Sequence, residues 1–324
     1  MVLPLRWALC FAFHPATTDP MLAKLPGPIR ILLAMLLLAV NILLHVLPLF
    51  ALTLLKLVVP ARGVRQACSR ALVAIAESWI GVNNFLFGLF TRIRWQVEGL
   101  AGLRRDGNYL VLCNHQSWVD IPVLQKVFNR RVPFMRFFLK QQLIWVPLLG
   151  PAWWALDFPF MKRYSRETLL RHPELQGRDR EATRRACAKF RHLPVAVMNF
   201  VEGTRFTPAK HAAQSSPYRH LLRPKAGGLA FVLDAMGDAL HAALDVTIVY
   251  PEGRPTMMDL IAGRVHDIRV HVRELAIDAG LVGSYDDDPA FRGRVKLWVN
   301  ELWREKDERI ARMLTAAEAA PTGD

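Results

Sequence analysis

A histidine and an aspartate separated by four residues, His115 and Asp120, are the first pair in the chain that could do chemistry. They directly follow the apolar run at 109–113, which has the composition of a strand, so we expect them in a loop at a strand end, where α/β folds place catalytic groups. A carboxylate bound to one imidazole nitrogen fixes the tautomer and stabilises the cation formed when the other nitrogen accepts a proton. The pair therefore predicts a general base, His115, with Asp120 as its partner.

Spacing alone does not establish this role. His14 and Asp19 have the same separation, in a segment that we expect to be disordered. An aspartate that caps a helix, next to a buried and hydrogen-bonded histidine, would also give the pattern. The position of His115 and Asp120 at the end of a strand is what favours catalysis.

A second polar motif, Glu-Gly-Thr-Arg at 202–205, follows another strand-like apolar run. Gly203 permits a tight turn there, and the planar guanidinium of Arg205 suits a phosphate group. We expect Glu202 to organise the loop through hydrogen bonds rather than to transfer protons. Lys225, within Pro-Lys-Ala-Gly, is a further phosphate-binding candidate, and each of these cations could instead be a solvated surface charge.

Four ordered blocks of the sequence resemble the glycerophospholipid acyltransferase family, especially the lysophosphatidic acid acyltransferases and their relatives that act on other lysophospholipids. The blocks are Asn-His-Gln-Ser-Trp-Val-Asp at 114–120, Phe-Met-Lys-Arg at 160–163, Phe-Val-Glu-Gly-Thr-Arg at 200–205 and Val-Tyr-Pro at 249–251. The resemblance covers residues 93–251. One departure is the second block, which lacks the glycine and the β-branched residue that many members place around the phenylalanine.

The resemblance implies an enzyme, an O-acyltransferase of the 1-acylglycerol-3-phosphate O-acyltransferase type. Its reaction would move a fatty acyl group from acyl-CoA or acyl carrier protein to the free hydroxyl of a lysophospholipid, with 1-acyl-sn-glycerol-3-phosphate as the favoured acceptor and phosphatidic acid as the product. A lysophospholipid with a headgroup, such as lysophosphatidylinositol or a lysocardiolipin, is the close alternative, because the runs at 202–207 and 223–227 resemble that branch. The alternative of another class is a non-catalytic membrane-binding protein that has kept the fold.

The resemblance also implies roles for individual residues, with His115 and Asp120 as the catalytic pair. With Lys225 added from its sequence context, the expected substrate-binding residues are Glu202, Gly203, Thr204, Arg205, Arg163 and Lys225. Because the acceptor alcohol is itself the nucleophile, no covalent enzyme intermediate is required. We expect no bound cofactor, since the acyl thioester is a co-substrate.

The four cysteines, Cys10, Cys68, Cys113 and Cys187, show no CxxC or Cys/His ligand spacing. The sequence therefore predicts neither a metal site nor a disulfide framework, and a reducing compartment fits best. Cys113 could be an acyl-accepting thiol, but it continues an apolar strand, which favours a small buried hydrophobe.

A membrane segment is predicted at 29–59, where the strongly polar residues that interrupt the apolar run are Arg30, Asn41, His45 and Lys56. A cleaved signal peptide is the main alternative, but the run is too long and no small-residue cleavage site follows it. With such an anchor, the net charge of +14 predicts anionic lipid headgroups, rather than nucleic acid, as partners. A slight excess of basic residues after the segment favours a catalytic domain on the cytoplasmic side, and we expect the membrane to be a bacterial inner membrane.

The remaining pattern divides the chain into five parts. Residues 1–28 form a poorly defined lead, and 29–92 hold the anchor and an apolar helix at 71–90, expected either at the membrane interface or buried. Strand and helix patterns alternate through 93–255, which predicts an α/β acyltransferase domain with a mixed sheet flanked by helices. A strand and a charged helix extend it through 256–314, and 315–324 are expected to be a disordered tail.

Overall fold

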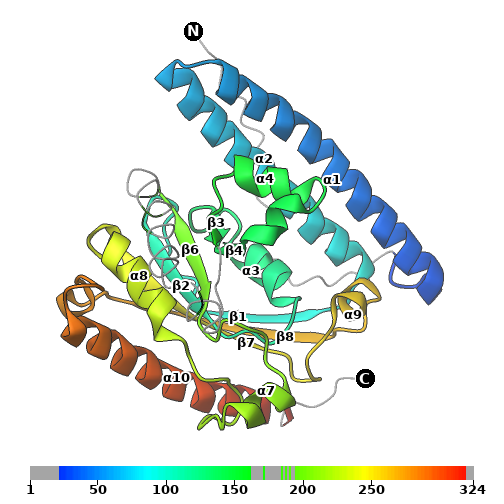
Figure 1. Ribbon diagram of the computed structural model, residues 1–324. Helices are drawn as coiled ribbons and strands as arrows, with labels where there is room; N and C mark the ends of the chain where they lie inside the picture. Colours follow the sequence, from blue (N-terminus) through cyan, green and yellow to red (C-terminus); the bar gives the residue numbers. More distant parts are fainter. Residues whose placement is uncertain are drawn as a thin grey trace.

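The computed structural model describes residues 22–161 and 194–318, together with Arg171, Arg184, Cys187 and Phe190. A six-stranded sheet carries helices on both faces, and a hairpin of two long helices lies along one side (Figure 1). The predicted α/β class, with a mixed sheet flanked by helices and an apolar N-terminal helix, is confirmed. Arg163 lies outside the described residues.

The sheet has the strand order β1-β8-β7-β2-β6-β3. Its strands are β1 (Arg94–Glu98), β2 (Tyr109–Cys113), β3 (Met135–Phe137), β6 (Ala196–Phe200), β7 (Ala242–Val249) and β8 (Asp267–Leu275), and a separate pair is formed by β4 (Leu139–Lys140) and β5 (Phe160–Met161). Only β7 and β8 pair antiparallel. Because β2 runs parallel to both of its neighbours, the carboxyl ends of β2, β6 and β7 meet at one edge.

Strand β2 is buried on both faces, which is why its sequence is a continuous apolar run. Its side chains alternate between two cores. Leu110 and Leu112 pack with α8 (Ala226–Met236) and α10 (Pro289–Glu318). The other three side chains of the strand pack with α3 (Asp120–Phe128) on the opposite face. Two packed layers therefore hold the strand that leads into the His-Asp loop.

Shorter helices complete the fold. These are η1 (Gln141–Trp145), α4 (Leu149–Ala155), α7 (Pro208–Ala213), η3 (Gly237–Ala239), α9 (Met257–Ile261) and η4 (Ala279–Leu281). The closing helix α10 continues to Glu318, past residue 314, where we expected it to end. Its last residues include Ala316 and Ala317, and alanine is the strongest helix former.

The N-terminal hairpin consists of α1 (Gly27–Val58) and α2 (Arg62–Phe90). We expected the second helix to begin at residue 71, whereas it starts nine residues earlier, directly after a short turn. Polar side chains join the two helices: Asn41 donates to Asn83 at 2.8 Å, and the His45 ring bonds the Ser78 hydroxyl at 3.1 Å. Such bonds are hard to replace away from water, so they fix the register of the pair.

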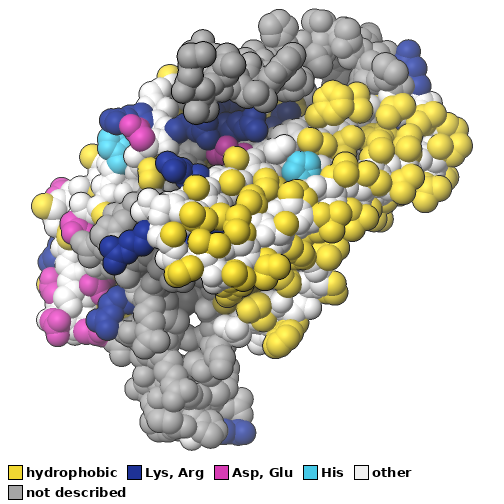
Figure 2. All heavy atoms as spheres, turned by 90° about the horizontal axis from the view of Figure 1, so that it is seen from above, with side chains coloured by type: hydrophobic (Ala, Val, Ile, Leu, Met, Phe, Trp, Pro, Cys, Tyr) yellow, Lys and Arg dark blue, Asp and Glu magenta, His cyan; other side chains and the backbone are white. Residues whose placement is uncertain are grey.

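Both hairpin helices are long and apolar enough to cross a membrane. Their outer surface is hydrophobic, and Figure 2 shows these side chains gathered over the hairpin when the molecule is seen from above. Both ends of α1 also touch the α/β domain: Arg30 donates to the Ala262 carbonyl, and Lys56 pairs with Asp157 at 3.4 Å. The hairpin is therefore attached along its length, with one face on the domain and one face free.

A buried group of charges lies between the sheet and α10. Asp245 of β7 pairs with Lys306 at 2.5 Å and with Arg309 at 2.9 Å, and both Asp245 and Lys306 are fully buried. Burial raises the pKa of Asp245, but the two cations outweigh it and hold the pKa below the usual range. Lys306 also donates to the Leu112 carbonyl at 3.4 Å, directly beneath the end of β2.

Candidate active site

The catalytic pair predicted from the sequence meets at the end of β2. The Nδ1 atom of His115 lies 2.8 Å from Oδ2 of Asp120, which is the first residue of α3. A carboxylate only accepts hydrogen bonds, so this contact puts the ring proton on Nδ1. The Nε2 atom is then left with its lone pair, and it has no hydrogen-bond partner among the described residues. His115 is thus arranged to accept a proton.

The loop around His115 is fixed by Asn114 and Phe200. The Asn114 side chain exchanges two hydrogen bonds, both 2.9 Å, with the backbone of Ile248, which continues the β2–β7 pairing after β2 has ended. The imidazole of His115 stacks on the ring of Phe200, with centroids 3.8 Å apart and planes 14° from parallel. The backbone turn and the plane of the base are therefore both set before any substrate binds.

The Asp120 carboxylate has four hydrogen-bond donors around it. Besides His115, its Oδ2 accepts from the backbone N–H groups of Gln116 (2.7 Å) and Ser117 (2.9 Å), and its Oδ1 accepts from the Tyr250 hydroxyl at 2.7 Å. Burial, followed by the charge of Asp120, raises the pKa of Tyr250 well above its ordinary value, so the hydroxyl keeps its proton. All four donors hold Asp120 in one orientation.

Tyr250 and Phe200 were not predicted as site residues. Each belongs to a block that carries the family resemblance, Tyr250 in Val-Tyr-Pro and Phe200 at the start of Phe-Val-Glu-Gly-Thr-Arg. Nothing local in the sequence indicates that these side chains touch the His-Asp pair, because Tyr250 lies 130 residues from Asp120.

Glu202 joins the two loops of the site. Its Oε1 accepts from the backbone N–H of His115 and its Oε2 from that of Leu222, both at 2.9 Å, and the side chain is fully buried. We expected Glu202 to bind substrate, but each of its carboxylate oxygens accepts a hydrogen bond from the protein backbone. The structure therefore supports the expectation that Glu202 organises the loop.

The rest of the Glu-Gly-Thr-Arg loop is arranged around two lysines. Gly203 has φ of 68° and a Cβ placed there would lie 3.1 Å from the Lys225 side chain, so the turn brings Lys225 against the loop. The Thr204 hydroxyl accepts from Lys210 at 2.7 Å, a contact that the sequence did not indicate. The Arg205 guanidinium lies over the ring of Trp118, 4.3 Å from its centroid.

Burial favours the protonated thiol form of Cys113. The side chain is fully buried, as expected from the apolar run, and burial is the main cause that raises the pKa of its thiol well above the ordinary value. A nucleophilic cysteine must be a thiolate, so the geometry disfavours an acyl-accepting role. Across the described part of the chain, His, Cys, Asp and Glu side chains form no cluster of three that could hold a metal ion.

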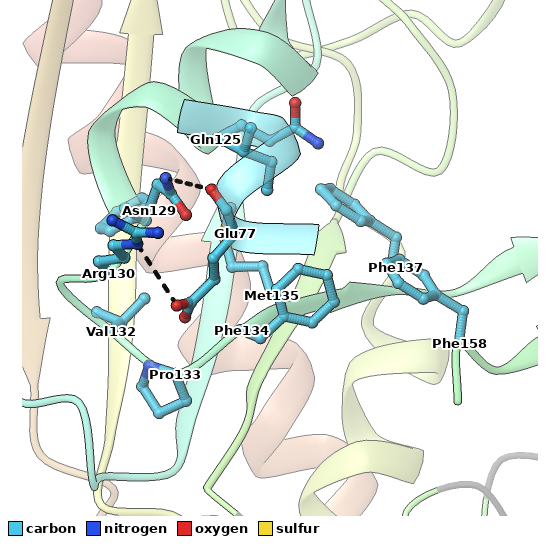
Figure 3. A pocket seen from close by; sticks show the side chains of 12 residues that line it. Glu77, Gln125, Asn129, Arg130, Val132, Pro133, Phe134, Met135, Phe137 and Phe158 are labelled. Carbon is cyan, nitrogen blue, oxygen red and sulfur yellow. Dashed lines mark hydrogen bonds and ion pairs between the residues drawn. The ribbon is translucent and has the colours of Figure 1, made fainter. Parts of the chain in front are cut away.

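A row of aromatic side chains leads away from His115. The ring of Phe200, which is stacked on His115, has its centroid 6.4 Å from that of Phe137, and the centroids of Phe137 and Phe158 are 6.2 Å apart. Phe137 and Phe158 line a hollow between α2, α3 and the segment 130–135 (Figure 3), where Arg130 points toward the Glu77 carboxylate. The row thus connects the site to the side of the domain that carries the hairpin.

The first prediction concerns the pH dependence of stability. Burial raises the pKa of Glu202 to about 7, so between about pH 4.3 and 7 the folded state binds more protons than the unfolded state and is destabilised as the pH rises. At 1.36 kcal/mol per pKa unit, this amounts to about 4 kcal/mol. We expect Glu202→Gln to remove that part of the pH dependence, as measured by the free energy of unfolding in detergent at pH 5 and pH 8. An unchanged pH dependence in the variant would contradict the assignment.

Comparisons with known proteins place this geometry in a family. The Acyltransferase family matches residues 94–281, more than half of the chain, and the chain therefore belongs to it. Lysocardiolipin acyltransferase 1 of Danio rerio is 26% identical over 255 residues, which cover 74% of this chain and 60% of that protein. The 1-acyl-sn-glycerol-3-phosphate acyltransferase delta of Mus musculus is 23% identical over 213 residues, covering 62% of this chain and 51% of that protein. The chain thus spans between half and two thirds of the length of each of these relatives.

A solved structure is similar over nearly the whole chain. The crystal structure of the 1-acyl-sn-glycerophosphate (LPA) acyltransferase PlsC from Thermotoga maritima gives a TM-score of 0.53 at 16% identity, covering 92% of this chain and 100% of that one. At this level of identity the likeness shows the fold.

Proposed function

We propose that the protein is an O-acyltransferase that transfers a fatty acyl group from acyl-CoA or acyl carrier protein to the free hydroxyl of a lysophospholipid. The observation that carries this proposal is the His115 imidazole, held by Asp120 through Nδ1 and stacked on Phe200, with Nε2 left open. A base with this geometry suits removal of a proton from an alcohol. The names of the relatives, which include acyltransferases for lysocardiolipin and for 1-acyl-sn-glycerol-3-phosphate, support this class of substrate.

In the proposed reaction, Nε2 of His115 takes the proton of the acceptor hydroxyl while the oxygen attacks the thioester carbonyl. The Asp120 carboxylate stabilises the imidazolium that forms. The tetrahedral intermediate then collapses, the carbon–sulfur bond breaks, and the imidazolium returns the proton to the departing thiolate. The histidine is regenerated, and no acyl-enzyme is formed.

We favour 1-acyl-sn-glycerol-3-phosphate as the acceptor, with a headgroup-bearing lysophospholipid as the alternative. Arg205 lies in the Glu-Gly-Thr-Arg loop, which Glu202 joins to His115, and Lys225 packs against this loop at Gly203; both cations support a phosphate-bearing acceptor. The test offers purified protein a panel of lysolipids with one radiolabelled acyl-CoA and analyses the diacyl product. Formation of labelled phosphatidic acid alone would support the favoured acceptor. Failure to acylate any lysolipid would favour the non-catalytic alternative.

The proposed location is a bacterial inner membrane, with the hairpin in contact with lipid and the catalytic domain on the cytoplasmic side. The exposed apolar face of α1 and α2 supports the attachment. Cys68, Cys113 and Cys187 are free thiols, which fits a reducing compartment. Orientation can be tested with Ser284→Cys, because a membrane-impermeant thiol reagent should label this loop position only after the cells are opened.

The second prediction concerns Arg205, which we propose binds the acceptor phosphate. Charge-assisted hydrogen bonds contribute about 1.5 to 3 kcal/mol, so Arg205→Ala should weaken the use of 1-acyl-sn-glycerol-3-phosphate by roughly ten- to a hundred-fold in kcat/KM. Arg205→Lys should recover only part of the loss, because an ammonium keeps the charge without the planar fork. The measurement is steady-state kinetics with each variant.

A monoacylglycerol, which lacks the phosphate, is the control acceptor for this prediction. Residual activity toward it should change little in Arg205→Ala, so the preference for the phosphate-bearing acceptor shrinks. An equal loss with both acceptors, in a folded variant, would show that Arg205 holds the loop through its contact with Trp118 and would assign the phosphate to another cation.

A further inference from the structure

A second arginine, Arg254, lies beside the catalytic loop, in the turn that follows β7. Its Nε atom donates to Oε1 of Gln116 at 2.6 Å, and Gln116 directly follows His115 in the chain. The next residue, Pro255, accepts a hydrogen bond from the Ser117 hydroxyl through its carbonyl oxygen. The turn that carries Arg254 is therefore joined to the His-Asp loop at two consecutive positions.

The backbone after Arg254 is also fixed. Thr256 caps the start of α9 in a reciprocal arrangement, in which the Thr256 hydroxyl accepts from the Asp259 N–H at 3.1 Å and the Asp259 carboxylate accepts from the Thr256 N–H at 2.8 Å. Arg254 therefore extends from a short segment that is held at both ends, and its side chain is presented to the site by fixed backbone.

The Arg254 guanidinium is stacked on an aromatic ring that belongs to the other loop of the site. Its central carbon lies 3.9 Å from the ring centroid of Phe206, and the Phe206 N–H donates to the His115 carbonyl at 2.8 Å. Stacking of this kind leaves the edge of the guanidinium free for hydrogen bonds. Both supports of Arg254, the Gln116 amide and the Phe206 ring, are thus held by the His115 segment.

The charge of Arg254 is not neutralised within the described residues. No acidic side chain there forms an ion pair with it, although the Glu202 carboxylate acts on it electrostatically, and its two terminal nitrogens have no hydrogen-bond partner in that part of the chain. Arg264, ten residues later, differs: its guanidinium pairs with Asp259 at 2.7 Å. Burial against its neighbours lowers the pKa of Arg254, but an arginine remains charged at neutral pH.

Arg205 and Arg254 are presented by the same two loops in a crossed arrangement. Arg205 comes from the Glu-Gly-Thr-Arg loop and lies on Trp118 of the His-Asp loop. Arg254 lies on Phe206, which directly follows Arg205, and it bonds Gln116, two residues before Trp118. Each guanidinium keeps an edge free in the loops that adjoin His115, which gives the site a further cation beyond Arg205 and Lys225, the cations that support a phosphate-bearing acceptor in the proposed function.

From this geometry we propose that Arg254 binds a second phosphate group of the substrates, separate from the acceptor phosphate assigned to Arg205. This inference rests on the proposed acyl transfer. The phosphate can belong to the headgroup of a lysophospholipid that carries more than one phosphate, or to the nucleotide part of acyl-CoA. The chemistry that recognises it is the same in both cases, a charge-assisted hydrogen bond from the free edge of the guanidinium.

The test compares Arg254→Gln and Arg254→Lys with the matched control Arg264→Gln in steady-state kinetics. Two donors are used, acyl-CoA and the phosphate-free acyl-N-acetylcysteamine thioester, and two acceptors, 1-acyl-sn-glycerol-3-phosphate and a lysocardiolipin. If the nucleotide is the source, Arg254→Gln raises KM for acyl-CoA by roughly ten-fold or more and leaves KM for the phosphate-free thioester unchanged. If the headgroup is the source, only KM for lysocardiolipin rises. Arg254→Lys should recover part of either loss.

Equal changes with every donor and acceptor, or effects no larger than those of Arg264→Gln, would overturn the proposal. A binding measurement separates this result from failure of the proposed function. Coenzyme A, and lysocardiolipin in detergent micelles, are titrated into the full-length protein by calorimetry, which needs no turnover. At least one should bind the Arg254→Gln variant about ten-fold more weakly than the wild type, even if no acyl transfer is detected. Unchanged affinity for both would also overturn the assignment of Arg254.

Discussion

His115→Ala is expected to abolish acyl transfer while leaving the protein folded and bound to membranes. General base catalysis contributes about 10² to 10⁴-fold to a rate, and here no other described side chain occupies the position of Nε2. The side chain is largely buried on Phe200, but its loop is held by bonds that alanine keeps, namely those from the His115 backbone to Glu202 and Phe206. Activity should therefore fall far more than stability. The measurement is kcat with radiolabelled acyl-CoA, next to a thermal unfolding curve.

His241→Ala is the matched control for this experiment. His241 directly precedes β7, at the opposite end of the sheet from His115, and its ring lies 3.4 Å from the Glu274 carboxylate. Its loss should leave kcat within a few-fold of the wild type. Near-normal turnover by a folded His115→Ala protein would rule out the proposed base and with it the mechanism.

Asp120→Asn should reduce kcat severely, by about 10²-fold or more, but by less than His115→Ala does. The asparagine can place its carbonyl oxygen where Oδ2 lies and still accept from the N–H groups of Gln116 and Ser117 and from the His115 ring. Its amide group would then face the Tyr250 hydroxyl, which can rotate to accept a bond. The loop is kept and the negative charge is lost, so the effect reports how much the charge stabilises the imidazolium. The measurement is kcat at saturating substrates.

Tyr250→Phe gives the graded comparison, since it removes one of the four donors to Asp120 and leaves the charge. A hydrogen bond to a charged group contributes about 1.5 to 3 kcal/mol, so we expect a loss of up to roughly ten- to a hundred-fold. Asp106→Asn, in an exposed turn, controls for a generic effect of removing an acid. If Asp120→Asn cost no more than Tyr250→Phe, the carboxylate would only shape the loop.

The sequence predicts the parts of the site that depend on local order. The apolar run before His115 predicted β2, and the end of that strand predicted the loop with the catalytic pair. The same reasoning placed Glu202 and Arg205 at the end of β6. Because parallel strands end at one edge of a sheet, the two loops could be expected to meet, and the bond from the His115 N–H to Glu202 joins them.

Contacts across long stretches of chain were beyond such reasoning. Lys306 lies in a highly charged helix, and nothing in its neighbourhood indicates that its ammonium is fully buried, because its partner Asp245 lies 61 residues earlier on another element. Arg254 had no local signal for the same reason. The early start of α2 was missed because Arg62 and Arg65 resemble the basic residues that follow a membrane segment.

The attachment of the hairpin along the domain has a consequence for lipid desorption. A lysolipid with a sixteen-carbon chain needs about 12 kcal/mol to leave a bilayer completely, at about 0.8 kcal/mol for each CH₂ group. Phe137 and Phe158 pack in one cluster with Leu49 of α1 and Leu72 of α2, so the row of aromatic side chains that begins beneath His115 ends on the hairpin. In the proposed reaction, a chain that follows this surface remains in contact with apolar groups while its glycerol hydroxyl reaches the base. Most of the free energy of complete desorption is then not required. The supply of acceptor to the site depends on diffusion within the membrane plane.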